Sequence, residues 1–256
     1  MKKFTGLLVQ EHRHFGLSNY LIAGLTAIFV FLGPELIYKV FQDQMQSDVS
    51  GIRFMMTILA AALVGLNSIV MFSSSLNRDI KTKELWLHNS QSMYTLIGAK
   101  IVYHGLSLIT LCFIAFLGLF FVGGLIVGTL WQYLIFGIAC LIITILFYIF
   151  FIAVVLFLIA LNTQISRYLG KLSYILVVVI GVFLLELLER FPTISFLKIG
   201  RVPLSNFNAY LPTFADRQLG INLYFDFYFV EVVVIGAIVI AIYLLMCKWM
   251  ERVITR

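Results

Sequence analysis

One stretch of this chain limits its possible folds more than any other feature. Residues 101–166 run for 66 positions without an Asp, Glu, Lys or Arg. A membrane-crossing helix needs about 20 mostly apolar residues, so this run is too long for one crossing and predicts a hairpin of two. The turn is expected near 128–133, where Trp131 and Tyr133 lie, because aromatic residues favour the membrane–water interface.

Composition agrees with a membrane protein. Hydrophobic residues make up 62% of the 256 residues and charged residues 12%, against about 45–50% and about 25% in a soluble domain. A soluble globule of this size could not bury so much apolar surface, which excludes a soluble enzyme, a secreted disulfide scaffold and a disordered chain. The formal charge of +6 is scattered between apolar runs, a pattern that argues against nucleic-acid binding.

Counting the uncharged stretches predicts an all-α integral membrane protein with six transmembrane helices. They are expected at about 15–38, 54–77, 101–127, 132–161, 170–189 and 228–248. The three cysteines lie in apolar stretches without metal-ligand spacing, so neither a disulfide nor a metal site is predicted for Cys112, Cys140 and Cys247. Ala61 and Gly65, four residues apart in the second span, predict a close helix contact.

The residues before the first span predict a helix that lies in the interface. Phe4, Leu7 and Leu8 fall on one face of residues 1–14 at helical spacing. Glu11 intrudes on that apolar face. A cleaved signal peptide is not expected, since the apolar run begins late and no cleavage site follows it.

The basic residues are distributed unevenly between the two predicted sides of the membrane. The side that holds both termini carries twelve Lys and Arg and a net charge of +8, and the other side a net charge of −2. By the positive-inside rule both termini are expected in the cytoplasm. The cytoplasmic connection 78–100 and the external segment 190–227 are too long to be simple turns. The external segment is apolar for a loop and is expected to be re-entrant, shielded by neighbouring helices.

The cytoplasmic connection carries the most informative pattern. An acidic residue and three apolar residues precede a break rich in Asn and Ser, and a Lys follows where the third span begins. This resembles the connection between the second and third spans of ABC-2-type transporter permeases. The residues at the family spacing are Glu84, Leu85, Trp86, Leu87, Ser92 and Lys100. The departures are Ser90 in place of the usual Pro, Met93 where Arg is common, and Gly98 one place early.

The resemblance covers the whole chain and implies a bacterial cell-membrane permease that works as one of two copies. It implies that the coupling helix, formed by Glu84, Leu85, Trp86, Leu87 and His88, docks on a separate ATPase subunit that supplies the ATP and Mg²⁺ chemistry. The alternative is an ordinary interfacial loop helix.

No catalytic or nucleotide site is predicted in this chain. A phosphate-binding loop needs a Gly-rich turn before Lys-Ser/Thr, whereas Leu172 follows Lys171 and Ile165 stands where the first Gly would be. All four histidines lie before residue 105, so no His is expected to meet Glu186 near the outer side. No Ser-His-Asp arrangement is recognisable either.

Four acidic residues are expected near the outer end of the last two spans. A carboxylate at mid-helix depth costs about 2.5–3.5 kcal/mol, so such residues usually face a protein interior or a wet cavity. One reading is an acidic lining of a substrate exit, and the other is helix-end residues that reach headgroups or Arg190. The four candidates are Glu186, Glu189, Asp226 and Glu231.

The resemblance implies an exporter, and the composition favours hydrophobic or amphipathic substrates, above all membrane-active peptides. The chain has 24 Phe and 12 Tyr and little charge inside its spans, which suits an apolar pathway better than a hydrophilic one. The alternatives are export of lipids or drugs and, from another class, a non-transporting scaffold or immunity-type membrane protein.

Overall fold

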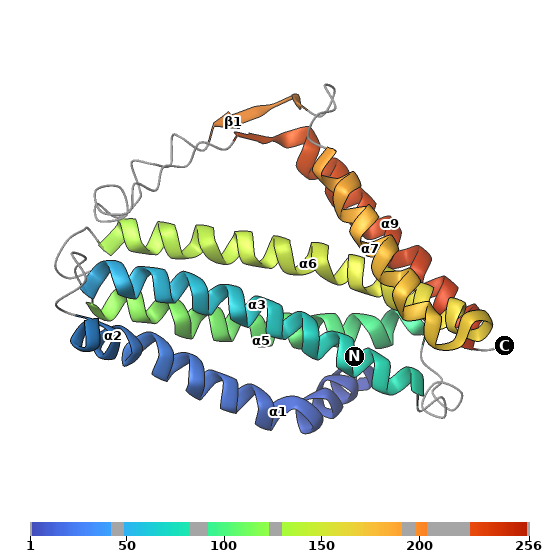
Figure 1. Cartoon of the computed structure of the whole chain (residues 1–256), viewed down its shortest axis with the longest axis horizontal. Helices are drawn as coiled ribbons and strands as arrows, with labels where there is room; N and C mark the ends of the chain where they lie inside the picture. The colour runs from blue at the N-terminus through green and yellow to red at the C-terminus, as the bar shows by residue number, and fades with distance from the viewer. Residues whose placement is uncertain are drawn as a thin grey trace.

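The computed structural model describes residues 2–41, 49–81, 92–122, 130–190, 198–203 and 226–254. These residues are almost entirely helical (Figure 1). The helices are α1 (Lys2–Phe31), α2 (Gly33–Phe41), α3 (Val49–Lys81), α5 (Met93–Val122), α6 (Leu130–Leu169), α7 (Ser173–Arg190) and α9 (Phe229–Ile254). A 3-10 turn, Gly170–Leu172, joins α6 to α7, and two short strands, β1 (Arg201–Pro203) and β2 (Asp226–Tyr228), pair antiparallel.

Five helical stretches of the described residues are long and apolar enough to cross a membrane. They are Phe4–Phe31, Ile52–Ile80, Met93–Gly118, Gly137–Phe183 and Phe229–Arg252. The fourth is 47 residues long and includes parts of both α6 and α7 with the turn between them. Many large apolar side chains on these helices are exposed, among them Leu66, Phe147 and Val179. The all-α membrane protein expected from composition is therefore supported.

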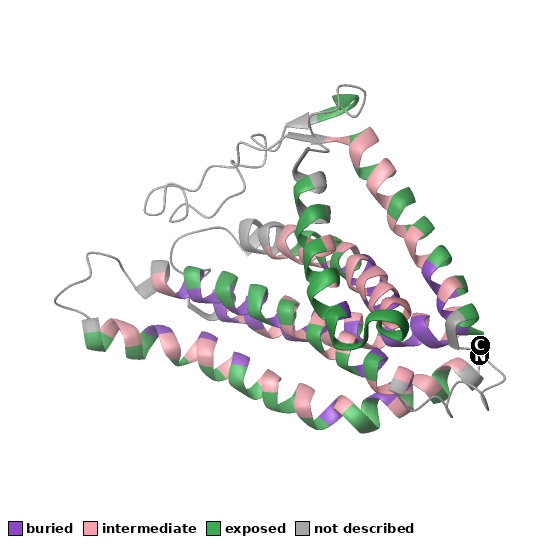
Figure 2. Cartoon of the chain, turned by 45° about the vertical axis from the view of Figure 1, so that its right-hand side comes forward, coloured by how far each residue is buried: buried purple, intermediate pink, exposed green. Residues whose placement is uncertain are grey.

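The core lies between α3 and α5, with α1 and α6 packed against them. Its largest buried side chains include Phe54 and Phe72 of α3 and Ile97, Leu108 and Leu111 of α5. Helices α7 and α9 run obliquely away from this group (Figure 1), and buried residues are sparse on both (Figure 2). Both termini, the end of α3 and the Gly170–Leu172 turn lie toward the same side of the molecule in Figure 1.

Several helices have bounds that differ from those of the predicted spans. The first predicted span, 15–38, is interrupted at Leu32, because Pro34 follows closely and has no N–H to donate to the helix. The N-terminal residues are continuous with α1 and form no separate helix, although α1 bends along its length (Figures 1 and 2). Helix α6 begins at Leu130 and so includes residues 130–133, where the sequence predicts a turn, and it extends to Leu169.

Helices extend into both ends of the predicted coupling segment 78–100. Helix α3 continues to Lys81 and α5 begins at Met93, so that residues 82–91 alone lie outside the described ranges. Ser92 caps α5: its Oγ accepts the backbone N–H of Thr95 at 3.4 Å, and its carbonyl accepts those of Thr95 and Leu96.

The two residues predicted to make a close helix contact in the second span, Ala61 and Gly65, differ in their surroundings. Ala61 is buried, as a helix contact requires, whereas a Cβ added to Gly65 would meet nothing within 4 Å. Gly65 therefore lies at an opening and not at a close contact.

The re-entrant external segment 190–227 lies largely outside the described residues, which there comprise Arg190, 198–203 and 226–227.

Candidate functional site

A cluster of buried charged and polar side chains lies where α1, α3 and α5 meet. Helix α1 contributes Glu11, α3 contributes Ser75 and Asp79, and α5 contributes Lys100 and His104. Their relative exposures range from 0% to 6%. The pairs on α3 and α5 are each four residues apart, so each pair lies on one face of its helix. We call these five residues the ionic cluster.

Lys100 is the centre of the ionic cluster. Its Nζ donates to a carboxylate oxygen of Glu11, lies 2.8 Å from Oδ2 of Asp79 and 2.5 Å from Oγ of Ser75. The Ser75 hydroxyl donates to the other Glu11 oxygen at 2.7 Å. A buried ammonium has three donors, and the three partners match that number. The arrangement therefore meets the requirement that a buried charge be paired and hydrogen-bonded.

Arg78 extends the ionic cluster toward the surface. Its Nη2 lies 3.8 Å from Glu11 and its Nε 3.5 Å from Asp79, and its guanidinium lies over the ring of Phe15 at 5.3 Å. Its side chain is 34% exposed. Two carboxylates thus face two cations, which keeps the formal charge of the group near zero.

His104 closes the ionic cluster on its apolar side. Its Nε2 lies 3.9 Å from Glu11, and within the described part of the structure this nitrogen has no hydrogen-bond partner. Three aromatic rings meet the imidazole edge to face, those of Phe15, Phe72 and Tyr103. The ring therefore separates the charged groups from the apolar core.

The ionic cluster lies beside the connection where the coupling helix is predicted. Asp79 is two residues from the end of α3, and Lys100 lies seven residues after the start of α5. These are the two helices that border residues 82–91, where the coupling helix is predicted. The ionic cluster therefore joins both helices to α1 beside that connection.

A second ion pair lies near the opposite end of α3. Nη2 of Arg53 lies 3.1 Å from Oε1 of Glu35 on α2. Arg53 is buried with a side chain 4% exposed, whereas Glu35 is 53% exposed. Among the described residues, the Nε and Nη1 atoms of Arg53 find no hydrogen-bond partner.

The structure describes only some of the predicted site residues. The five coupling residues, Glu84, Leu85, Trp86, Leu87 and His88, lie outside the described residues. Glu186 is exposed on α7, and Glu189 belongs to the last turn of the same helix. Asp226 lies in β2 opposite Pro203, and Glu231, half-buried, lies in the first turn of α9. The strand pair lies at one end of α7 and α9 (Figure 1).

Sequence reasoning missed the ionic cluster as a site, although three signals were present. Glu11 disturbed the apolar face of the N-terminal helix, Lys100 ended the family pattern, and the spacing of Lys100 and His104 puts them on one helix face. Only the tertiary fold joins them. Within the described ranges, no group of three or more His, Cys, Asp and Glu side chains is arranged to hold a metal ion.

Comparison with known proteins gives no relative: no family model, no curated protein and no solved structure matches this chain.

Proposed function

We propose that this chain is the transmembrane subunit of an ATP-driven ABC exporter of the ABC-2 type. It has six membrane-spanning helices, α1, α3, α5, α6, α7 and α9, and both termini in the cytoplasm. A second copy of a permease completes the pathway, and a separate ATPase subunit binds ATP and Mg²⁺. The observation that carries the proposal is the environment of Lys100, the last residue of the family-like pattern, at the centre of the ionic cluster.

The ionic cluster is placed to transmit movement of the α3–α5 connection to three helices. Residues 82–91 connect α3 to α5, so a partner that displaces this connection displaces the two helix ends. Lys100 bonds to Glu11 of α1 and pairs with Asp79 of α3, and breaking such a pair leaves an uncompensated buried charge. The three helices therefore respond together. In an exporter this links ATP hydrolysis on the partner to rearrangement of the spans.

The proposed substrates are amphipathic, membrane-active peptides. The helices offer extensive apolar surface, and the acidic residues Glu186 and Glu231 lie on α7 and α9, which diverge from the α3–α5 core. Carboxylates there suit the Lys-bearing face of a cationic peptide. Export of lipids or drugs through the same permease is the nearest alternative.

A non-transporting scaffold or immunity-type protein is the alternative from a different class. The two classes differ in their partners. We expect the full chain, purified by affinity from its native membrane, to bring down a nucleotide-hydrolysing subunit that mass spectrometry identifies. Purification without any ATPase, under conditions that preserve membrane complexes, would favour the scaffold.

A further inference from the structure

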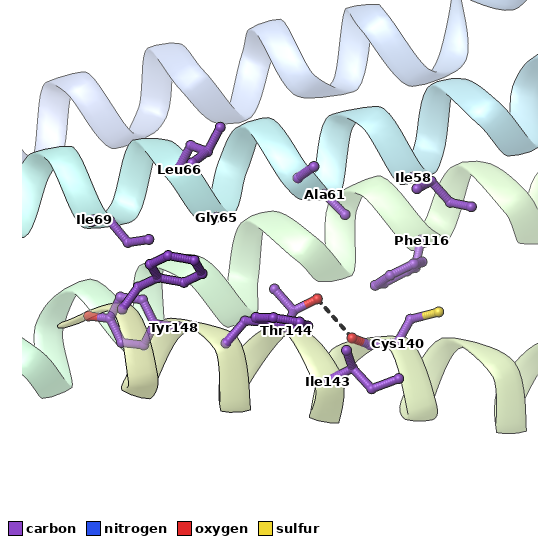
Figure 3. Close-up of a pocket in the computed structure, with 13 residues that line it drawn as sticks. Ile58, Ala61, Gly65, Leu66, Ile69, Phe116, Cys140, Ile143, Thr144 and Tyr148 are labelled. Carbon is purple, nitrogen blue, oxygen red and sulfur yellow. Dashed lines mark hydrogen bonds between the residues drawn. The ribbon is translucent and has the colours of Figure 1, made fainter. Parts of the chain in front are cut away.

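An apolar groove runs between α3 and α6, outside the ionic cluster. It encloses a cavity of about 490 Å³. Ile58, Ala62, Gly65 and Ile69 line it from α3, Phe147 is among the residues that line it from α6, and α5 contributes Phe116 (Figure 3).

The polar groups of this lining are already bonded within the protein. The hydroxyl of Thr144 donates to the carbonyl of Cys140 at 2.8 Å, and that of Tyr148 donates to the carbonyl of Ile101 at 3.0 Å (Figure 3 draws the first bond). The groove thus offers its occupant an apolar surface with satisfied polar groups. The expected occupant is a hydrocarbon chain.

The groove continues into a polar pocket toward the end of α3. Ile69 lines both, and the second cavity measures about 700 Å³. Its lining from α3 includes Ser73, Ser74, Asn77 and Arg78. Among the described residues that line this pocket, Arg78 bears the charge; its guanidinium also lies 3.8 Å from Glu11 and 3.5 Å from Asp79, and its side chain is 34% exposed. A polar, cationic end therefore follows an apolar length.

The dimensions fit one lipid. Along α3 the distance from Asn77 is about 18 Å to Gly65 and about 24 Å to Ala61, at about 1.5 Å per residue. The half-thickness of a bilayer with its headgroups is about 20–22 Å. Helices α3 and α6 pack directly against each other, and the cavity in the groove between them measures about 490 Å³. A helix about 10–12 Å in diameter would fill such a volume within about one turn, so the cavity suits a slender acyl chain better than a helix.

We propose that this groove is a binding site for one anionic glycerophospholipid. An acyl chain lies between α3 and α6 against Gly65 and Phe147, and the phosphate-bearing headgroup lies at Ser73, Ser74, Asn77 and Arg78. Hydroxyl and amide groups donate to phosphate oxygens, and the guanidinium of Arg78, which Glu11 and Asp79 share with the headgroup, donates to them as well. Lipid binding at this site does not depend on transport, so its test is independent of the proposed exporter function.

The acyl part is tested by filling the groove. Because a Cβ on Gly65 meets no atom within 4 Å, Gly65→Leu places its side chain in the cavity without a backbone clash. Native mass spectrometry of the purified full chain, titrated with phosphatidylglycerol, is expected to show one tightly bound lipid in the wild type. Gly65→Leu is expected to weaken that binding about tenfold.

Gly24→Leu is the matched control. Gly24 lies on α1 outside the groove, and a Cβ there also meets nothing within 4 Å. It is expected to bind phosphatidylglycerol like the wild type. Equal phosphatidylglycerol binding by Gly65→Leu and the wild type would overturn the proposed site. A shift from dimer to monomer in Gly65→Leu, with lipid binding unchanged, would also overturn it, because a second copy of the chain would then fill the groove.

The headgroup part is tested by charge at Ser74, which is exposed, lines the polar pocket and stands outside the ionic cluster. Ser74→Glu is expected to weaken phosphatidylglycerol binding about fivefold and Ser74→Lys to strengthen it by a similar factor, with phosphatidylcholine binding little changed. Parallel changes for both lipids, or none for either, would contradict an anionic headgroup in this pocket. Loss in Gly65→Leu of binding to an added cationic amphipathic peptide, with lipid binding intact, would assign the groove to a peptide and overturn the lipid site.

Discussion

The ammonium group of Lys100 on α5 donates to the carboxylate of Glu11 on α1, which lies 89 positions earlier in the chain. Both side chains are almost completely buried, at 1% and 6% exposure. Asp79 and Ser75 of α3 bond to the same ammonium. One side chain therefore ties three helices together next to the connection between α3 and α5.

Removing that cation is expected to destabilise the protein strongly. Lys100→Met leaves Glu11 and Asp79 buried beside each other with their central partner gone, and breaking a buried ion pair costs about 3–5 kcal/mol. Thermal unfolding of the full chain in detergent is expected to show a large loss. Lys171→Met, at an exposed position of the Gly170–Leu172 turn, is the matched control and is expected to change little.

The double variant Lys100→Met with Glu11→Gln distinguishes charge from packing. It is expected to recover part of the lost stability, because without Lys100 two carboxylates face Arg78 alone and Glu11→Gln removes one of them. If the double variant is no more stable than Lys100→Met, or if Lys100→Met matches the wild type, the ionic cluster does not hold the three helices together.

The sequence predicted the helices of this fold better than their connections. Long uncharged runs require helices in a bilayer, so α3, α5, α6 and α9 were expected close to where they lie. The start of α5 was not, because the charge of Lys100 predicts a membrane boundary there. The fold buries it inside α5 by supplying Glu11 and Asp79 as partners, and such compensation depends on residues distant in sequence. The side-chain carbonyl of Asn162 on α6 likewise accepts the hydroxyl of Ser173 on α7 at 2.9 Å.

The second ion pair is expected to respond asymmetrically to substitution. Glu35→Gln leaves the buried guanidinium of Arg53 beside a neutral partner, whereas Arg53→Met replaces an incompletely bonded buried cation with an apolar side chain of similar length. Replacing a buried ion pair by apolar side chains is often neutral, and the Glu35 that Arg53→Met leaves without its partner is 53% exposed. Unfolding in detergent should therefore show Glu35→Gln to be less stable than Arg53→Met. The reverse order would mean that Arg53 contributes more to stability than its bond with Glu35.

Topology is open to direct labelling. In a background without native cysteines, Gly51→Cys and Ser205→Cys are expected to react with an impermeant thiol reagent from outside intact cells, and Asn89→Cys is expected to react only after lysis. The reason is the charge difference between the two predicted sides, +8 against −2. Labelling of Asn89→Cys from outside would invert the orientation.

The acidic residues of α7 and α9 are expected to affect transport more than hydrolysis. Cells that lack this chain should become sensitive to cationic amphipathic peptides, and Glu186→Gln should lower peptide export while basal ATP hydrolysis remains near the wild-type rate. Glu186 is exposed on α7, so its substitution is not expected to disturb the core. Unchanged peptide export in the cells without the chain would remove peptides as the substrate and favour lipid or drug export.

Docking of an ATPase subunit at the coupling residues is the test of whether the chain belongs to an ABC exporter. Trp86 has the largest apolar side chain of the five coupling residues, and aromatic anchors commonly dominate interfaces. Trp86→Ala and Glu84→Arg are therefore expected to weaken association with an ATPase subunit while membrane insertion stays intact.

The most direct measurement places a photoreactive amino acid at residue 86 of the full chain in its native membrane. After irradiation, mass spectrometry is expected to find residue 86 cross-linked to a nucleotide-hydrolysing subunit, and the same substitution at the exposed residue Lys171 is expected to give no such product. Cross-links from residue 86 to lipid alone, with Trp86→Ala and Glu84→Arg leaving every partner of the chain unchanged, would contradict an exporter driven by an ATPase.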